Sequence, residues 1–115
     1  VIDGSNELST KIKNQITNPE ITKYISIASL WEIAIKINNG KLKLDFSFEE
    51  LRNIIISNGF EILALDFEHI LKITNLERIH KDPFDRIIIA QAQVEKLTII
   101  TRDANFKKYK VKVMW

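Results

Sequence analysis

Hydrophobic residues recur along the chain at two spacings, one typical of short β-strands and the other of helices. Runs of apolar and β-branched residues predict four strands, at 24–28, 60–65, 97–101 and 111–114. Apolar residues three and four positions apart predict helices at 29–39, 47–58, 67–77 and 83–96, with a short helical turn at 104–109. Strands therefore alternate with helices.

This alternation predicts an α/β fold, in which helices cover both faces of a parallel sheet in three layers. A length of 115 residues fits one domain over 1–115. The helix at 83–96 carries Ile87, Ile88 and Ile89 and is apolar nearly all round. Such a helix is covered by its neighbours, so we expect it in the core.

Composition narrows the class of protein. The chain is 45% hydrophobic and 28% charged, which indicates a globular domain and not a disordered one. A net charge of +2 does not by itself indicate nucleic-acid binding. The absence of cysteine excludes disulfides and thiolate metal sites and fits a cytoplasmic protein. No apolar run approaches the roughly 18 residues that span a membrane.

Two carboxylates stand one turn apart where the apolar helix at 83–96 begins. Asp82 followed by Pro83 is typical of an N-cap with proline in the first helical position. Asp85 occupies the third position, where helix-end amides favour a negative charge. One cap suffices for a helix, so we interpret Asp82 as a cap and supporting residue and Asp85 as a candidate metal ligand.

Two further acids follow strands, and each has a structural alternative. Glu32 completes a capping-box spacing with Ser29 and can pair with Lys36 one turn on. Ser47 to Glu50 has the same spacing, which we interpret as capping only. Asp103 can either cap the next helical turn or take part in a site.

In a parallel sheet, ligands bind beyond the carboxyl ends of the strands, where Glu32, Asp85 and Asp103 are expected. Clustered carboxylates repel one another, so a cation would stabilise them. Ligands that are all oxygen, without His or Cys, favour Mg²⁺ or Mn²⁺ over Zn²⁺. These ions activate a bound water against a phosphodiester.

Other polar and aromatic residues give weaker signals. Lys36, Arg86 and Arg102 are candidates for attracting phosphate, with solvated charges or ion pairs as the alternative. We interpret His80 as a contact at the helix entry and not as a catalytic acid. Trp31 and Trp115 are interpreted as packing residues, and Asp66 as a helix cap.

Four segments, in order, carry a resemblance to a known family. They are Ser26-Ile27-Ala28-Ser29-Leu30-Trp31-Glu32-Ile33-Ala34-Ile35-Lys36, Gly40-Lys41-Leu42, His80-Lys81-Asp82-Pro83-Phe84-Asp85-Arg86 and Ile100-Thr101-Arg102-Asp103. They resemble the PIN-domain (PilT N-terminus-like) subfamily of VapC-like ribonuclease toxins from bacterial type II toxin–antitoxin systems. The resemblance implies an endoribonuclease dependent on Mg²⁺ or Mn²⁺, inhibited by a cognate antitoxin and dimeric.

The resemblance also implies roles for individual residues. Glu32, Asp85 and Asp103 would be the catalytic metal ligands. Asp82, Arg86 and Thr101 would support the site. Lys36 and Arg102 would be candidate contacts to the RNA substrate.

The family has a further Asp at the end of a central first strand. Asp3 invites that assignment, but only twenty-nine positions separate it from Glu32, against nearly forty in the family. We therefore interpret Asp3 as a loop residue and expect the first strand to be missing. Weak metal binding and impaired activity would follow. The alternatives are a PIN remnant that only binds an antitoxin or dimerises, and a nuclease that acts on DNA.

Overall fold

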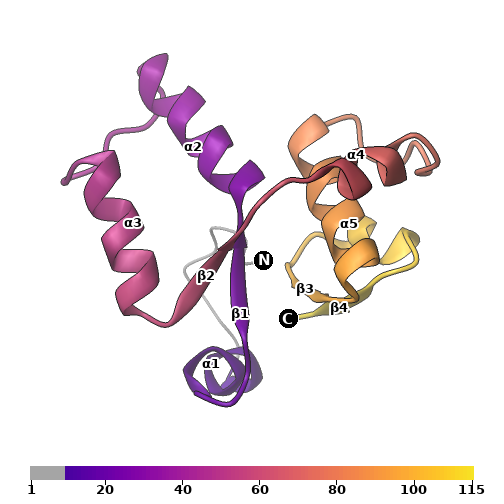
Figure 1. Ribbon diagram of the computed structural model, residues 1–115, viewed down its shortest axis with the longest axis horizontal. Coiled ribbons are helices and arrows are strands. Elements are labelled where there is room, and N and C mark those ends of the chain that lie inside the picture. The colour runs from indigo at the N-terminus through magenta and orange to yellow at the C-terminus, as the bar shows by residue number, and fades with distance from the viewer. Residues whose placement is uncertain (1–9) are drawn as a thin grey trace.

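The computed structural model describes residues 10–115, which form five α-helices, one 3₁₀ helix and four strands (Figure 1). Asp3 lies outside the described residues. The elements follow one another as α1 (Thr10–Thr17), β1 (Lys23–Ser26), α2 (Ile27–Asn38), α3 (Phe48–Ser57), β2 (Phe60–Leu63), α4 (Phe67–Ile73), α5 (Pro83–Glu95), β3 (Thr98–Ile100), η1 (Ala104–Lys108) and β4 (Lys112–Met114). The predicted alternation of strands and helices is confirmed.

The strands pair in parallel, as predicted, but among the described residues they form two separate two-stranded sheets. β1 pairs with β2, with Lys23 opposite Phe60, and β3 pairs with β4, with Thr98 opposite Lys112. A cavity of about 240 Å³ lies between the two pairs and is lined by residues of β1, β3 and α5. Within residues 10–115, β1 and β3 border this cavity and do not pair with each other.

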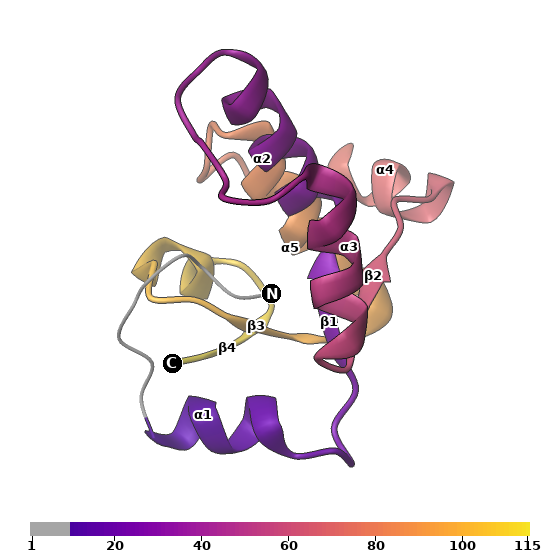
Figure 2. The ribbon, with the colours of Figure 1, turned by 90° about the vertical axis from the view of Figure 1, so that its left-hand side faces the viewer.

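Helices stand on either side of the β1–β2 pair, with α2 and α3 to one side and α4 and α5 to the other (Figure 1). Viewed at right angles, α1 lies below the β3–β4 pair, away from the other helices (Figure 2). Of the described helices, none combines the length and apolar character that a membrane crossing requires. The arrangement is an α/β fold built on parallel strands.

The core gathers around α5. The prediction that this helix is covered on all sides is confirmed, because six consecutive residues, 87–92, are buried. Ile89 has no exposed surface and packs in one cluster with Ile99 of β3 and Phe106 of η1. From the α2 side, Ala28 joins the same cluster. The second half of the chain therefore supplies most of the core.

A buried polar contact joins α5 to the carboxyl ends of β1 and β2. The Ser26 hydroxyl donates to Oε1 of Gln91, and the Gln91 amide donates to the carbonyls of Leu63 and Ala64 at 3.2 and 3.3 Å. Ser26 and Gln91 are almost fully buried, so each polar atom needs these partners. The contact sets where α2 begins relative to α5.

This contact also explains a correction. Ser26 is the N-cap of α2, and its hydroxyl accepts a hydrogen bond from the amide of Ala28 at 3.0 Å. The helix therefore starts at Ile27, two residues earlier than predicted, and the strand expected at 24–28 ends at Ser26. The capping box predicted between Ser29 and Glu32 is wrong, because both residues lie within the helix.

Other predicted caps are confirmed. Ser47 caps α3 by accepting from the amide of Glu50, and Asp66 caps α4 by accepting from the amide of His69. The helix predicted at 67–77 ends at Ile73, so a nine-residue connection, 74–82, leads into α5. Gly59, at φ +82°, makes the turn between α3 and β2 in a conformation that side chains disfavour.

Candidate metal centre

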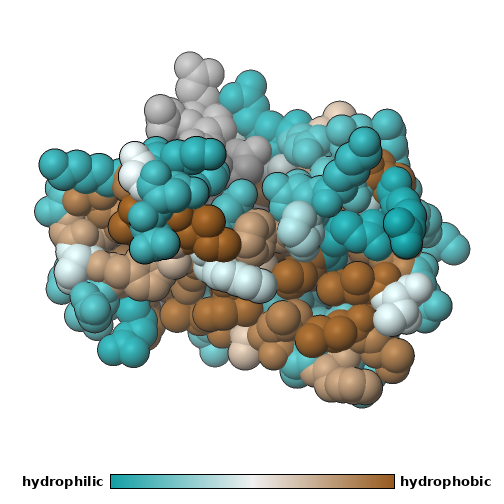
Figure 3. All heavy atoms as spheres, turned by 90° about the horizontal axis from the view of Figure 1, so that it is seen from above, coloured by the Kyte–Doolittle hydropathy of each residue, from teal (hydrophilic) through white to brown (hydrophobic). Residues whose placement is uncertain are grey.

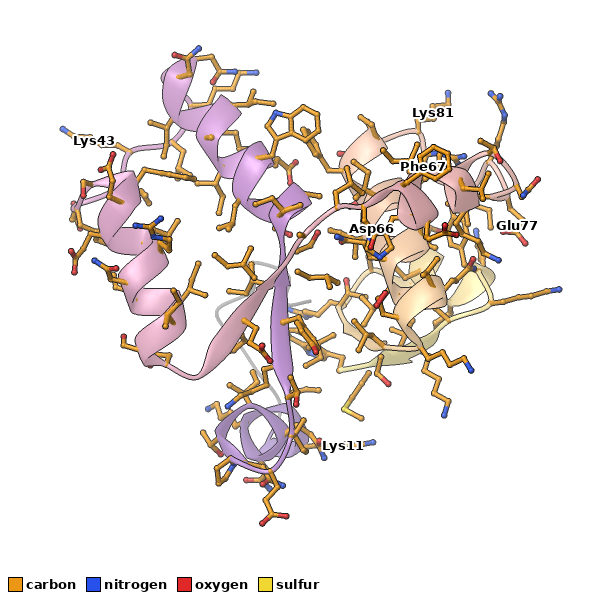
Figure 4. All side chains as sticks on the ribbon, viewed as in Figure 1. Lys11, Lys43, Asp66, Phe67, Glu77 and Lys81 are labelled. Carbon is orange, nitrogen blue, oxygen red and sulfur yellow. The ribbon has the colours of Figure 1, made fainter. Side chains whose placement is uncertain are left out.

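The candidate site is built where α5, η1 and the 74–82 connection meet. Asp82 is the N-cap of α5, as predicted, with Oδ1 accepting from the amides of Phe84 at 2.8 Å and Asp85 at 3.4 Å. The Arg86 guanidinium donates to the carbonyls of Glu77 at 2.7 Å and Leu76 at 3.5 Å. Arg86 thereby ties the connection to α5; Glu77 and Lys81 lie on this connection in Figure 4.

Three side chains from these elements come together. One ligand atom each of His80, Asp85 and Asp103 lies within 4.8 Å of the other two. His80 Nε2 is 3.2 Å from Asp103 Oδ2 and 4.0 Å from Asp85 Oδ2. In an octahedral magnesium site, neighbouring ligands stand about 3 Å apart and opposite ligands about 4 Å apart. The spacing therefore suits ligands, or near neighbours of ligands, of one small cation.

The Asp103 carboxylate is held by its surroundings. Asp103 is the N-cap of η1, and its Oδ1 accepts from the amide of Asn105 at 2.9 Å. Its own amide donates to the Thr101 hydroxyl at 3.1 Å. Thr101 is buried, and its amide donates to the carbonyl of Met114 in β4. The capping alternative for Asp103 is thus real, but it leaves Oδ2 directed at His80.

The site carries more negative charge than its surroundings readily stabilise. Burial is the main cause that raises the pKa of Asp85 above its ordinary value, and the charge of Asp82 raises it further. His80 opposes this rise in the pKa when its ring is protonated, while Glu32 and Asp103 add smaller increases. Asp85 is therefore the carboxylate that gains most from a nearby cation.

Asp103 responds in the opposite direction. The amide of Asn105 is the main cause that lowers the pKa of Asp103, partly offset by burial. The hydrogen bond from His80, the charge of His80 when its ring is protonated, and the charge of Lys108 lower that pKa further. Asp103 is stabilised as a carboxylate by fixed donors, whereas Asp85 is not.

Glu32 lies near this cluster but not in it. The side chain pairs with Lys36 at 3.7 Å, which confirms the predicted pair one helical turn apart. Its charge still raises the pKa of Asp85, so the two carboxylates act on each other. The rings of Trp31 and Phe84, next to Glu32 and Asp85 in sequence, pack edge to face at 5.1 Å. This packing places the Glu32 helix beside the start of α5.

The weaker candidates lie outside the cluster. Lys36 is half exposed and engaged with Glu32. The Arg102 guanidinium lies 5.6 Å from the centre of the Trp115 ring, in a cation–π contact. Trp31 is 51% exposed, so the Phe84 contact covers only part of its ring.

His80 is the residue that sequence reasoning missed. We predicted only a contact at the helix entry, and the imidazole also contacts Asp103 directly. The only signal in the sequence is a histidine two positions before the capping Asp82. That signal is weak, since the folded chain contributes Asp103 from more than twenty residues away.

The donor set can be tested against a divalent cation. Two carboxylates suit hard ions such as Mg²⁺ and Mn²⁺, and an imidazole that donates a hydrogen bond to one of them is a common neighbour of such ligands. Burial and the neighbouring carboxylates raise the pKa of Asp85, so a cation beside it would stabilise its ionised form. The residues present therefore fit a divalent metal ion.

The model of the PIN domain family matches residues 2–112, nearly the whole chain. No curated protein matches the chain. The chain therefore belongs to the PIN-domain family, whose members are generally nucleases that need a divalent metal.

Proposed function

We propose that this PIN-domain chain is the ribonuclease toxin of a bacterial type II toxin–antitoxin pair and hydrolyses RNA phosphodiester bonds with Mg²⁺ or Mn²⁺. The observation that carries the proposal is the convergence of Asp85, Asp103 and His80 at the start of α5. The sequence resemblance to VapC-like toxins over 26–36, 80–86 and 100–103 supports the finer assignment. The cytoplasm is the compartment we propose.

Asp85 and Asp103 would hold the metal, with Glu32 completing the site from α2. A divalent ion in such a site lowers the pKa of a bound water and neutralises charge on the phosphate. Asp82 keeps the start of α5 in place through its cap, and Arg86 fixes the 74–82 connection beside it. Thr101 holds the backbone of Asp103. Lys36 and Arg102 would face the RNA at the edge of the site.

The proposed partners are RNA as substrate, a cognate antitoxin and a second copy of the chain. Large apolar side chains on α2 and α3 support binding to another protein. Ile35 and Ile56 are 42% and 58% exposed, and a groove of about 340 Å³ lies between the two helices. Hydrophobic side chains also reach the surface in a broad band when the molecule is seen from above (Figure 3).

The second candidate function is a PIN remnant that binds an antitoxin or dimerises without cutting RNA. One specific observation favours it: the tight cluster contains two carboxylates, with Glu32 outside it. Fewer negative ligands would weaken the binding of Mg²⁺ or Mn²⁺.

An RNA cleavage assay separates the two functions. The chain is purified and incubated with single-stranded RNA in Mn²⁺ or EDTA, alongside a version preceded by a strand of the Leu-Leu-Asp-Thr-His type. We expect Mn²⁺-dependent cleavage by the version with the added strand, and Asp85→Asn in that version should abolish it. The matched control is Asp45→Asn, which changes an exposed acid on the α2–α3 connection and should cleave normally. Absence of cleavage in both versions would favour the remnant, and preferential cutting of DNA would reassign the substrate.

A further inference from the structure

We propose that His80, fixed by Tyr109, is a positioning residue that orients the Asp103 carboxylate toward Asp85 for metal binding. The proposal rests on the proposed metal-dependent function and adds to it a residue that orients a metal ligand without binding the metal itself. It is carried by three contacts, between Tyr109 and the His80 backbone, between Tyr109 and the imidazole, and between the imidazole and Asp103.

Tyr109 determines which ring nitrogen of His80 carries the proton. The backbone amide of His80 donates to the Tyr109 hydroxyl at 2.7 Å, so this oxygen already accepts one hydrogen bond. Its own proton is then free to go to His80 Nδ1, 3.3 Å away. An Nδ1 that accepts leaves the ring proton of a neutral imidazole on Nε2.

Two hydrogen-bond donors fix the orientation of the Asp103 carboxylate. Nε2–H of His80 points at Asp103 Oδ2, 3.2 Å away, and donates to it. The amide of Asn105 donates to the other oxygen, Oδ1. Because each oxygen is held by a separate donor, the carboxylate cannot turn about its Cβ–Cγ bond without breaking one of them. Each oxygen keeps a free lone pair for a cation.

Two aromatic rings hold the His80 imidazole in place. The His80 ring stacks on Tyr109 with centroids 5.5 Å apart and packs against Phe106 at 4.7 Å. Its side chain is only 8% exposed. Phe106 and Tyr109 are themselves buried in the core cluster. The ring therefore cannot swing away from Asp103 without disturbing the core.

A second buried histidine supplies the contrast. His69 is also almost fully buried, and its ring accepts from the amide of Asp66 and contacts Glu95 at 3.4 Å. Those contacts close the capping box of α4 and join α4 to α5, away from Asp85 and Asp103. His69 is thus a matched control for the loss of a buried imidazole.

The test measures Mn²⁺ binding to the whole chain, by the electron paramagnetic resonance signal of free Mn²⁺. His80→Phe keeps an aromatic ring but has no donor, and we expect Mn²⁺ affinity to fall about tenfold to a hundredfold, as for other residues that orient metal ligands. His80→Gln, which keeps an N–H donor, should recover most of the affinity. His69→Gln should lower thermal stability but leave the Mn²⁺ affinity of the folded protein unchanged.

A second measurement uses the metal-free protein. Nitrogen-15 NMR of the imidazole should show His80 as the Nε2–H tautomer, and Tyr109→Phe should shift the population toward Nδ1–H. In the Mn²⁺ complex, electron spin echo modulation should show no directly bound nitrogen. A strong coupling to ¹⁴N that His80→Gln removes would make His80 a ligand and overturn the positioning role.

The outcomes separate this proposal from the one it rests on. Normal Mn²⁺ affinity in a folded His80→Phe overturns the role of His80 and leaves the nuclease proposal intact. If the wild type shows the Nε2–H tautomer but does not measurably bind Mn²⁺, the metal-dependent function is overturned while the hydrogen bond to Asp103 stands.

Discussion

The two halves of the described chain use the same kinds of element but bury them differently. The half formed by α4, α5, β3, η1 and β4 supplies nearly all of the core cluster, and it brings His80, Asp85 and Asp103 together. The half formed by β1, α2, α3 and β2 contributes Ala28 to that cluster and exposes much of its apolar surface. Large exposed residues in this half are Ile27, Trp31, Ile35, Phe46, Phe48, Ile54 and Ile56, whereas those of the other half are confined to α4, at Phe67, Ile70 and Leu71.

The difference shows which part of the structure can hold polar side chains close to one another. Asp103 and His80 stand on backbone that Tyr109 and Phe106 anchor in the core. Glu32 stands on a helix joined to α5 through Ala28, the Trp31–Phe84 contact and the Ser26–Gln91 hydrogen bond. A well-packed half therefore presents a tight cluster, while the acid of the other half pairs with Lys36.

The largest expected effect is on metal binding, where substitution of Asp85 should cost more affinity than substitution of Glu32. Asp85→Asn should weaken Mn²⁺ binding about a hundredfold, since it removes a carboxylate from the tight cluster, whereas Glu32→Gln should weaken it less than about tenfold. Calorimetric titration with Mn²⁺ measures both affinities. Equal losses would mean that Glu32 binds the metal as closely as Asp85 does, and that the two halves contribute alike.

A large effect on stability is expected where the halves are joined. Gln91→Leu should destabilise the protein by about 2–3 kcal/mol, because the Ser26 hydroxyl and the carbonyls of Leu63 and Ala64 lose buried partners. Urea denaturation measures the change in the free energy of unfolding. The matched control is Gln93→Leu, at a partly exposed position on the same helix, which should change it by less than about 0.5 kcal/mol. Similar effects of both variants would contradict the linking role of Gln91.

A smaller effect separates the two aspartates in the metal-free protein. The pKa of Asp85 is raised by folding, so its ionised form lowers stability at neutral pH, and Asp85→Asn should raise the melting temperature slightly. The pKa of Asp103 is lowered, so its charge stabilises the fold above the unfolded pKa, and Asp103→Asn should lower the melting temperature.

The stabilisation by Asp103 should disappear as the pH falls through its folded pKa, where the wild-type carboxylate also takes up a proton. The cost of ionised Asp85 should disappear earlier, because its folded pKa is the higher of the two. Thermal melts from neutral to acidic pH, with EDTA present, test both signs. Shifts in the same direction at neutral pH would contradict the difference between the two carboxylates.

The smallest expected effect concerns the exposed apolar surface. Ile56→Ser, at a side chain that is largely exposed, should change the free energy of unfolding by less than about 0.5 kcal/mol. Ile89→Ala, at a position with no exposed surface, should cost about 2–5 kcal/mol in the same urea assay. A large loss from Ile56→Ser would show that α3 packs more tightly than its exposure indicates.

Local patterns in the sequence sufficed for most of the elements. The apolar run at 83–96 identified α5, and the residues Asp82, Ser47 and Asp66 identified helix starts that the structure confirms. These predictions worked because capping depends on residues within three positions of the helix start. The start of α2 was misplaced because its cap, Ser26, is stabilised by Gln91, a residue 65 positions away.

For the site, the amino-acid sequence by itself determined the acids that follow strands and the cap that opens α5. Only the tertiary structure decided which of them meet. It placed His80 between Asp103 and the core aromatics, left Glu32 with Lys36, and kept the two strand pairs on opposite sides of a cavity. The physical reason is that capping and helical periodicity act over a few residues. The contacts of His80 with Asp103 and Tyr109, by contrast, join segments more than twenty residues apart.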